Sequence, residues 1–358
     1  MKILIFIPSL SNKGGVERAT VNLANALSKY PNIIVTIVLF NSNSKSYFEL
    51  SDSLNILSLN IFDYKKQYLL VIKRIYQLLK SDYDFVITVE TISLLFSFIP
   101  YLLTRNKNKL VVWEHFNFKN NNGKKIRDWL RILAAKQADM VVLLTKRDQD
   151  EWLLNLSVKA RISYIYNISP FENDKQIYNI GSKNIIAVGR YTQVKGFDRL
   201  INIWTIFQNK YDVLDWSLDI IGYGEDEDKL KNLIDFRNVN NINLISTENI
   251  ELNYSSASFC CMTSYFEGLP MVLLEAQSFG LPCVAFDIFT GPSEIIDEST
   301  GILIQDGNLE AYADAIYALV SNPKLRNKMS FNTFEASKRF SEKVIAKRWI
   351  DELNRLAY

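Results

Sequence analysis

Hydrophobic and polar positions alternate along the chain in blocks that favour a protein of strands and helices. Short, continuously apolar runs, typical of strands buried on both faces, are separated by stretches with helical periodicity, for example residues 16–28 and 124–136. Alternation of this kind builds parallel sheets with crossover helices. The first series of predicted strands comprises residues 2–7, 33–40, 55–59, 85–89, 110–113 and 140–144.

A second series of strands indicates a second sheet, and comprises residues 184–188, 216–221, 242–245, 258–262, 282–285 and 302–304. Residues 169–183 between the two series are polar and contain Pro170 and Gly181, as expected of a linker. We therefore predict an α/β protein with two Rossmann-like, doubly wound parallel-sheet domains, residues 1–168 and 184–340, facing across a cleft.

Three helices are predicted to close the chain, at residues 309–321, 324–337 and 342–356. The last of them, within residues 341–358, can cross back onto the first domain. Residues 91–104 are the most membrane-like segment, but they contain Pro100 and are shorter than the roughly 20 residues of a membrane span. We expect a buried helix there, and a first strand rather than a secretory signal at residues 3–7.

The net charge of +2 conceals an asymmetry between the two halves of the chain. Residues 1–168 contain 23 Lys+Arg and 13 Asp+Glu, a net charge of +10, which leaves −8 for residues 169–358. This difference fits either two ordinary solvated surfaces or a first half that meets an anionic membrane or a phosphate-bearing acceptor.

The cysteines and the histidine limit the chemistry that the chain can perform. Cys260, Cys261 and Cys283 form no C-x-x-C pair or disulfide framework, so we expect buried apolar side chains in a reducing, cytosolic compartment. The only histidine, His115, follows a predicted strand and excludes a multi-histidine metal site. It fits a structural histidine or a ligand contact about equally well.

Ligands of open parallel sheets bind beyond the carboxyl ends of the strands, so motifs are sought there. The first strand runs into Gly14 and Gly15 at the start of a helix. Glycines allow the backbone to approach a ligand, and a helix N-terminus attracts phosphate. The segment is not the G-x-G-x-x-G of dinucleotide-binding proteins, and an ordinary tight turn explains it as well.

The second domain opens with a strand that ends at Gly189 and is followed by Arg190 and Lys195. Two cations beside a helix N-terminus suit a diphosphate, because Arg grips phosphate oxygens with a rigid fork and Lys supplies a point charge. Together they can neutralise a leaving group as a divalent metal would. The alternative is a pair of solvated surface cations.

Glu267 and Glu275 are the next candidate residues. Glu267 lies in a loop after a strand, and Glu275 falls about one turn inside the helix that begins near Pro270 or Met271. Carboxylates accept bidentate hydrogen bonds from vicinal hydroxyls, which a sugar and a ribose both present. Taken alone, the pair also fits chance acidic spacing.

In combination, these motifs resemble those of glycosyltransferase family four, a large family of retaining enzymes with the two-domain GT-B fold. The resemblance covers nearly the whole chain, and the chain looks like a member of the subgroup that builds bacterial surface polysaccharides. The segments that carry it are GGVER, EHFN, YNIS, GRYTQVKGFDRLI, GYGEDEDKL, SYFEGLPMVLLEAQSFGLPCVAFD and TGPSEII.

The resemblance implies a role for each matching residue. Backbone at Gly14 and Gly15 approaches the donor diphosphate, and Arg190 and Lys195 bind its oxygens. Glu275 holds the ribose hydroxyls, and His115 lies near the primary hydroxyl of the donor sugar. The donor sugar meets Glu267 and the backbone of Gly268, Leu269, Pro270 and Met271. Leu269 departs from many members, which have an aromatic or another residue there, and this leaves the identity of the donor sugar open.

The implied reaction transfers a glycosyl group with retention, through a transition state resembling an oxocarbenium ion. Glu267 and Glu275 are expected to bind hydroxyls rather than act as nucleophiles. A same-face mechanism, in which the leaving diphosphate accepts the proton of the acceptor, fits the two cations better. We expect no metal cofactor, because the three Asp-x-Asp sequences lie before a strand or at helix starts: 82–84, 148–150 and 226–228.

We expect a cytoplasmic enzyme that transfers a hexose or N-acetylhexosamine from a UDP-sugar to a glycan or polyprenyl-linked acceptor, with no nucleic-acid partner. The alternatives are a nucleotide-sugar epimerase on the same fold and a non-catalytic sugar-nucleotide-binding subunit of a polysaccharide assembly complex. The first needs further acid or base residues, and the second would be favoured by loss of Arg190, Lys195 or Glu267.

Peripheral contact with the inner face of the cytoplasmic membrane is a further hypothesis. Residues 65–80 read as an amphipathic basic helix with Lys66, Lys73 and Arg74 outside its apolar face, which comprises Tyr68, Leu69, Ile72, Ile75, Tyr76 and Leu79. A second cationic run, from Lys119 to Arg131, contains Trp129 and Leu130. The alternative is that the apolar face simply packs on the sheet.

Overall fold

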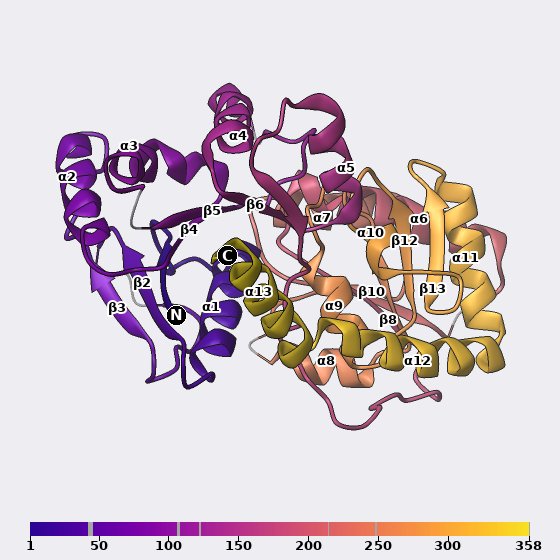
Figure 1. Ribbon diagram of the computed structural model, residues 1–358. Coiled ribbons are helices and arrows are strands. Elements are labelled where there is room, and N and C mark those ends of the chain that lie inside the picture. Colours follow the sequence, from indigo (N-terminus) through magenta and orange to yellow (C-terminus); the bar gives the residue numbers. More distant parts are fainter. Residues whose placement is uncertain (42–45, 106–107, 122, 214, 248, 358) are drawn as a thin grey trace. The chain divides into compact units, whose positions relative to one another are not determined.

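The computed structural model describes residues 1–41, 46–105, 108–121, 123–213, 215–247 and 249–357 (Figure 1). The chain divides into two compact units: unit 1 comprises Met1–Ile168 and Glu342–Tyr358, and unit 2 comprises Ser169–Ser341. Residues 169–183, where the sequence predicts a linker, belong to unit 2.

The described residues of unit 1 form a parallel sheet of seven strands in the order β3-β2-β1-β4-β5-β6-β7. In the centre of the sheet, Ile3 lies opposite Val35 on one side and Phe85 on the other. The strands are β1 (Lys2–Phe6), β2 (Ile34–Leu39), β3 (Asn55–Ser58), β4 (Phe85–Val89), β5 (Lys109–Trp113), β6 (Met140–Leu143) and β7 (Arg161–Tyr164). The sequence pattern does not predict β7, because this edge strand is mostly half-buried and contains Arg161 and Ser163.

Helices cover the sheet of unit 1, and one of them comes from the end of the chain. They are α1 (Gly15–Ser28), α2 (Tyr68–Leu79), α3 (Leu94–Thr104), α4 (Lys125–Gln137), α5 (Lys146–Asn155) and α13 (Glu342–Ala357). The α13 helix packs on this unit through Trp349, whose ring centroid lies 5.2 Å from that of Trp113. Glu342 and Glu352 of the same helix form ion pairs with Lys29 at 2.7 Å and with Arg161 at 2.8 Å.

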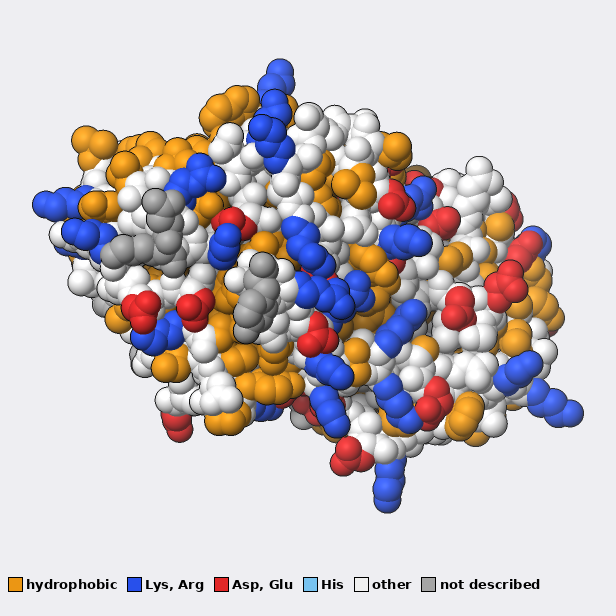
Figure 2. All heavy atoms as spheres, in the orientation of Figure 1, with side chains coloured by type: hydrophobic (Ala, Val, Ile, Leu, Met, Phe, Trp, Pro, Cys, Tyr) orange, Lys and Arg blue, Asp and Glu red, His pale blue; other side chains and the backbone are white. Residues whose placement is uncertain are grey.

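Two helices of unit 1 differ from the sequence prediction in the faces that they bury. On α2 the buried residues are Val71, Ile75 and Leu79, whereas Leu69, which the sequence places on the apolar face of the helix, is exposed. The segment expected to be a buried helix forms a 3₁₀ turn (Thr91–Ser93) followed by α3, and α3 is buried on one side only. Hydrophobic side chains gather at the surface over α2 and α3 (Figure 2). Within the described chain, no helix combines the length and the apolar composition that a membrane crossing requires.

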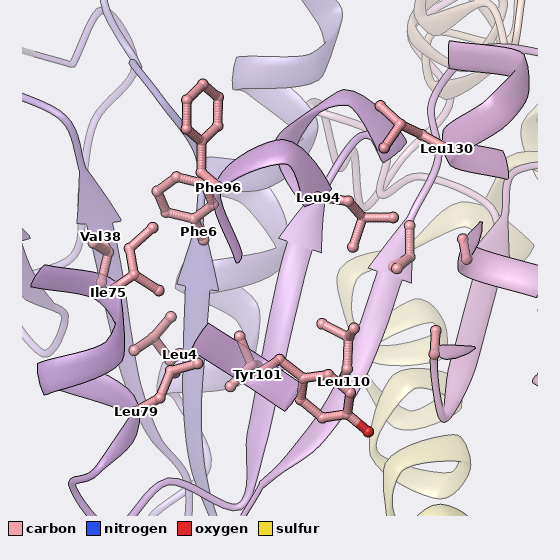
Figure 3. Close-up of a cluster of buried hydrophobic side chains, with 14 of the residues drawn as sticks. Leu4, Phe6, Val38, Ile75, Leu79, Leu94, Phe96, Tyr101, Leu110 and Leu130 are labelled. Atoms are coloured by element: carbon pink, nitrogen blue, oxygen red, sulfur yellow. The ribbon is translucent and has the colours of Figure 1, made fainter. Parts of the chain in front are cut away.

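Apolar side chains from α2 and α3 pack against the strands and form the core on that face of the sheet (Figure 3). Leu4 and Phe6 of β1 lie among them, and each is at most 2% exposed. Burial of a large apolar side chain stabilises a fold by roughly 1.5–3 kcal/mol, so this cluster fixes the sheet that carries the strand-end residues of unit 1.

The described residues of unit 2 form a parallel sheet of six strands in the order β10-β9-β8-β11-β12-β13. The strands are β8 (Asn184–Val188), β9 (Ser217–Ile221), β10 (Ile242–Ile245), β11 (Phe259–Met262), β12 (Cys283–Asp287) and β13 (Gly301–Gln305). The three cysteines lie in β11 and β12, and all are buried and free. The second predicted series of strands is therefore present, with ends that shift by at most two residues.

The helices of unit 2 are α6 (Phe197–Lys210), α7 (Glu227–Arg237), α8 (Ile250–Ser256), α9 (Met271–Ser278), α10 (Pro292–Ile295), α11 (Leu309–Ser321) and α12 (Pro323–Ser337). The short α9 begins at Met271 with Pro270 as its N-cap residue, at the start predicted from the sequence. This places Glu275 in the second turn of α9, where it is almost completely buried.

Candidate active site

The strand order of unit 2 locates a binding site at the ends of β8 and β11. From β8 the chain proceeds to β9 and β10 on one side, and it then returns to the other side with β11. Parallel sheets bind ligands where the strand order reverses in this way, outside the carboxyl ends of the strands. The loop after β8 carries Arg190 and Lys195, and the loop after β11 carries Glu267.

The loop after β8 is fixed by its own backbone and by Tyr191. The Tyr191 ring is buried, and its hydroxyl donates to the carbonyl of Ile220 at 2.8 Å. Its backbone NH donates to the carbonyl of Tyr223 at 2.8 Å. Gly222 is required beside it, because a Cβ there would overlap the carbonyl oxygen of Gly189. The backbone of this loop is therefore held rigidly against the loop after β9.

Lys195 and Glu267 form an ion pair across the two loops. The Lys195 Nζ lies 2.7 Å from the Glu267 Oε1, and both side chains are partly buried. Arg190 pairs instead with Glu225, at 3.1 Å, and both of these side chains are well exposed. The structure thus joins Lys195 to Glu267, 72 residues further along the chain, and directs Arg190 toward the loop after β9.

Arg199 of α6, which sequence reasoning did not single out, fastens the same two loops together. Its guanidinium donates to the carbonyls of Thr263 at 2.7 Å and Ser264 at 2.8 Å. The Thr263 hydroxyl in turn donates to the carbonyl of Gly196 at 2.9 Å. Gly196 has a positive φ of 64°, and a Cβ there would overlap the Thr263 carbonyl oxygen. These contacts explain in structural terms why the GFDR segment has glycine at position 196 and arginine at position 199.

The TGPS segment holds the backbone of the Glu267 loop. The Thr290 hydroxyl donates to the Glu267 carbonyl at 2.7 Å. Gly291 has a φ of 104°, and a side chain there would collide with Pro270 and approach the Gly268 carbonyl oxygen. Leu269 is buried in this arrangement. Residues 267–271, predicted to meet the donor sugar, therefore have a fixed backbone.

Glu275 lies deeper than Glu267 and has a different partner. It is 4% exposed, and its Oε2 accepts a hydrogen bond of 2.7 Å from the hydroxyl of Tyr254 on α8. Sequence reasoning did not identify Tyr254, which lies 21 residues before Glu275. The two predicted carboxylates thus lie at different depths of unit 2, one in an ion pair and one in a buried hydrogen bond.

Unit 1 has its own reversal of strand order, between β1 and β4. The loop after β1 leads to Gly14, which has an extended backbone and is the N-cap residue of α1. A Cβ on Gly14 would overlap the carboxylate of Glu17, which accepts a hydrogen bond from the Asn12 amide at 3.0 Å. Gly14 and Gly15 therefore lie at the predicted helix start, with an acidic side chain packed against Gly14.

His115 follows β5 and is buried beside Trp113, with ring centroids 4.4 Å apart. Among the described residues, its Nε2 has no hydrogen-bond partner. Burial is the main cause that lowers the pKa of His115 to about 4. The imidazole is therefore neutral at neutral pH, and it can form a hydrogen bond with a hydroxyl without carrying charge.

A buried charge network surrounds His115 and was not predicted. Glu114 is fully buried and accepts hydrogen bonds from the backbone NH groups of His115 and Phe116, each at 3.0 Å. The Arg127 guanidinium, from α4, bridges Glu114 at 3.0 Å and Glu90 at 3.2 Å. This network holds the turn that presents His115.

Glu90, at the end of β4, is the strained member of that network. It has a positive φ of 62°, which is uncommon for a residue with a side chain and is often found at functional sites. Burial, followed by the charge of Glu114, raises the pKa of Glu90 to about 7, although Arg127 opposes the shift. The carboxyl is thus close to half-protonated at neutral pH.

The network also corrects the predicted cationic run from Lys119 to Arg131, of which residue 122 lies outside the described residues. Arg127 and Arg131 are each 1% exposed, because they bind acidic side chains and backbone carbonyls inside unit 1. Leu130 is buried as well, whereas Trp129 is exposed. These two arginines are therefore structural and do not contribute to a basic surface.

The three Asp-x-Asp sequences lie in separate structural settings. Asp82 and Asp84 bind Lys2 through its side chain at 2.9 Å and its backbone NH at 2.7 Å. Asp148, in the first turn of α5, is buried and accepts from the Phe118 NH at 2.6 Å. Burial raises the pKa of Asp148 to about 7. Asp226 is the N-cap residue of α7.

Two Rossmann-like parallel-sheet units with candidate ligand-binding loops at their switch points have the architecture of GT-B glycosyltransferases. A family model described as Glycosyl transferases group 1 matches residues 170–336, and one described as Glycosyltransferase Family 4 matches residues 13–168. The chain therefore belongs to glycosyltransferase family four, and the resemblance that its motifs indicated is confirmed.

Named relatives support this assignment over the full chain. An uncharacterized glycosyltransferase of Haemophilus influenzae is 32% identical over 97% of this chain and 98% of that protein. The amylovoran biosynthesis glycosyltransferase AmsD of Erwinia amylovora is 28% identical over 99% of each chain. Among solved structures, a mutant of S. aureus TarM in complex with fondaparinux, α-GlcNAc-glycerol and UDP matches with a TM-score of 0.82. It covers 99% of each chain at 17% identity, which shows a common fold.

Proposed function

We propose that this enzyme transfers a hexose or N-acetylhexosamine, with retention, from a UDP-sugar to a hydroxyl of a glycan or polyprenyl-linked acceptor. The pathway we infer is the synthesis of a bacterial surface polysaccharide such as O-antigen, capsule or lipopolysaccharide. The name of AmsD, which matches along the whole chain, supports the pathway. The UDP in the TarM complex supports the nucleotide.

The observation that carries the proposal is the ion pair between Lys195 and Glu267 at the switch point of unit 2. Glu267 holds the ammonium group in place, and both groups remain partly accessible. A diphosphate oxygen is the partner that an oriented ammonium group suits, and a sugar hydroxyl is one that suits the carboxylate. The pair is therefore built to meet a phosphate and a sugar side by side.

The remaining residues take the following roles in the proposed reaction. Arg190, whose long side chain is exposed, binds the diphosphate oxygens from the side of the loop after β9. The backbone at Gly14 and Gly15 also approaches the diphosphate. The buried Glu275 accepts hydrogen bonds from the ribose hydroxyls. The neutral His115 contacts the primary hydroxyl of the donor sugar.

The reaction we propose proceeds on one face of the sugar. The bond from the anomeric carbon to the diphosphate lengthens, and positive charge develops on the ring as in an oxocarbenium ion. Lys195 and Arg190 stabilise the negative charge that the diphosphate gains. The acceptor hydroxyl attacks from the same face and passes its proton to a leaving diphosphate oxygen. Glu267 is committed to Lys195 and to a sugar hydroxyl in this scheme, so it is not the nucleophile.

We also propose that no metal ion is required. The charge that a divalent cation would supply comes from Lys195 and Arg190, which the chain carries at the proposed diphosphate site. Four of the Asp-x-Asp carboxylates serve the fold: Asp82 and Asp84 bind Lys2, Asp148 accepts from the Phe118 NH, and Asp226 lies at the start of α7.

Peripheral membrane contact through unit 1 is the last element of the proposal. Leu69 on α2 and Leu103 on α3 are exposed. Lys73 lies in α2, and Lys66 lies just before its first residue. Trp129 on α4 is also exposed, and Figure 2 shows basic side chains projecting over α4. Apolar side chains beside lysines suit the interface of an anionic bilayer, where each basic residue contributes about 1 kcal/mol. Such contact would bring the enzyme to a lipid-linked acceptor.

Donor binding tests the proposal without knowledge of the acceptor. Thermal shift with UDP-, ADP- and GDP-sugars should identify a UDP-sugar as the ligand that raises the melting temperature most, and product analysis would then define the sugar transferred. If an ADP- or GDP-sugar stabilised the protein most, that nucleotide and not UDP would be the donor nucleotide. If none of these sugar nucleotides stabilised the protein, the proposal would be contradicted.

A further inference from the structure

Tyr254 and Glu275 form a buried pair inside unit 2. Tyr254 is completely buried, and its hydroxyl lies 2.7 Å from Oε2 of Glu275. A hydrogen bond from a neutral donor to a buried carboxylate is stronger than one between neutral groups, and it fixes the orientation of the carboxylate. The position of the Glu275 side chain therefore depends on where the Tyr254 hydroxyl is held.

The Tyr254 ring is itself held by two aromatic side chains. It stacks on Phe279 with ring centroids 5.4 Å apart and an interplanar angle of 16°. Phe171 lies with its edge toward both rings, at 6.1 Å from Tyr254 and 5.5 Å from Phe279. Aromatic pairs of this geometry add roughly 0.5–1.5 kcal/mol each beyond burial, so the ring has little freedom to turn.

The segment that carries Phe171 is also tied to α9, the helix of Glu275. The Asn173 amide donates to the carbonyl of Ser278 at 3.0 Å, just after Glu275 on that helix. Ring, hydroxyl and helix are thus fixed relative to one another. The Tyr254 hydroxyl is thereby held against a carboxylate that the proposed function assigns to the substrate.

We propose that Tyr254 is a positioning residue of the nucleotide site, which orients the Glu275 carboxylate so that it accepts hydrogen bonds from the vicinal hydroxyls of a ribose. This rests on the proposed role of Glu275. A carboxylate offers about four lone-pair directions, so a bond from Tyr254 on one side is compatible with a diol on the other. Tyr254 does not touch the substrate; it acts through Glu275.

Binding of UDP and of 2′,3′-dideoxyuridine diphosphate, measured by calorimetry, tests this role. Tyr254→Phe removes only the hydroxyl, and we expect UDP to bind about 10- to 150-fold more weakly, the range for loss of a hydrogen bond to a charged group. Binding of the dideoxy nucleotide, which lacks the hydroxyls, should not change. In a Glu275→Gln background, Tyr254→Phe should have no further effect on either ligand.

Tyr101→Phe provides a matched control. Tyr101 is a buried tyrosine of unit 1 whose hydroxyl donates to Asp139 at the same distance of 2.7 Å. This variant should lose a comparable amount of stability and leave the binding of both nucleotides unchanged. If Tyr254→Phe does not fold, Phe279→Leu loosens the ring while keeping the hydroxyl, and it should likewise weaken UDP more than the dideoxy nucleotide.

The outcomes separate the two levels of the proposal. Wild-type protein that prefers UDP to its dideoxy form through Glu275, but is unaffected by Tyr254→Phe, would overturn the role of Tyr254 alone. Equal weakening of both nucleotides would also overturn it, because the hydroxyl would then serve general packing. Wild-type protein that binds none of UDP, ADP and GDP would contradict the proposed function, and the role of Tyr254 with it.

Discussion

The Lys195 ammonium lies 2.7 Å from the Glu267 carboxylate, although the two residues are in different loops and 72 positions apart. The parallel sheet of unit 2 makes this contact, because β8 and β11 are neighbours and both loops leave from their carboxyl ends. A cation whose position is set by a carboxylate is preorganised, and preorganised charge stabilises a transition state without reorganisation during the reaction.

Removal of either proposed diphosphate cation should therefore slow transfer. We expect Lys195→Ala and Arg190→Ala each to lower turnover by about 10²- to 10³-fold, because each loses a charge-assisted contact to the leaving group. Lys210→Ala is the control, since Lys210 forms an exposed ion pair with Asp314 away from the strand ends. Initial rates of folded variants decide the matter, and a wild-type rate in Lys195→Ala would remove that residue from the mechanism.

Loss of Arg127, which pairs with Glu114, should lower stability much more than loss of Arg190, which pairs with Glu225. Arg127→Met leaves the fully buried Glu114 carboxylate without its main partner, and such a loss destabilises a protein by about 3–5 kcal/mol. Arg190→Ala breaks an exposed pair, for which a change of at most about 1 kcal/mol is typical. Urea denaturation of both variants measures the difference. If the free energy of unfolding changed by an equal, small amount in both variants, other groups would stabilise the Glu114 carboxylate without Arg127.

His115 predicts a pH dependence of stability. Burial lowers its pKa to about 4 in the folded protein, against a usual value of about 6.5 in the unfolded chain. The unfolded chain therefore binds more protons below pH 6.5, and His115 makes the free energy of unfolding fall as the pH drops from 6.5 through 4.

The variant His115→Gln should lack this contribution. Relative to the wild type, its free energy of unfolding should rise by up to about 3 kcal/mol between pH 6.5 and pH 4. Chemical denaturation of both proteins at several pH values measures the relative change, in which the titration of Glu90 and Asp148 largely cancels. Two curves that stay parallel over this range would mean that the imidazole is not buried as described.

Membrane contact can be tested by flotation with vesicles of neutral and anionic lipid. We expect binding that rises with anionic lipid, falls with salt, and weakens when Lys66 and Lys73 are replaced by Glu or when Leu69 is replaced by Ser. Arg74 is left out of this set because its guanidinium binds the backbone carbonyls of Leu59 and Asn60. Lys229→Glu with Lys231→Glu, on α7 of unit 2, is the matched charge control. Equal recovery with both lipids would contradict a membrane role.

The sequence predicted the strands and the types of residue at the candidate site better than it predicted the contacts between those residues. Continuous apolar runs identify β1 and β4 because both faces of these strands are buried, whereas the half-exposed β7 has no such pattern. Lys195 and Glu267 were each expected at a strand end, but their ion pair depends on which strands are neighbours. That information lies in the tertiary structure.

Buried charges were the least predictable feature. Arg127 and Arg131 stand in a run of basic residues and look like surface cations, yet both are buried because Glu114, in the loop after β5, is their partner. Leu69 was placed on the apolar face of α2 by its spacing, but from that face the core takes only Ile75 and Leu79, and it takes Val71 in addition. In both cases the tertiary packing selects among side chains that helical periodicity alone does not distinguish.

Sugar transfer itself is the most direct test of the proposed function. Incubation of the protein with labelled UDP-hexoses and UDP-N-acetylhexosamines and a polyprenyl-linked sugar acceptor, in excess chelator, measures donor, reaction and metal requirement together. We predict a labelled, lipid-linked product whose new bond has the anomeric configuration of the donor, as determined by nuclear magnetic resonance, and its loss in Lys195→Ala. A product of inverted configuration, or activity that disappears with the chelator and returns with manganese or magnesium, would contradict the mechanism proposed for these residues.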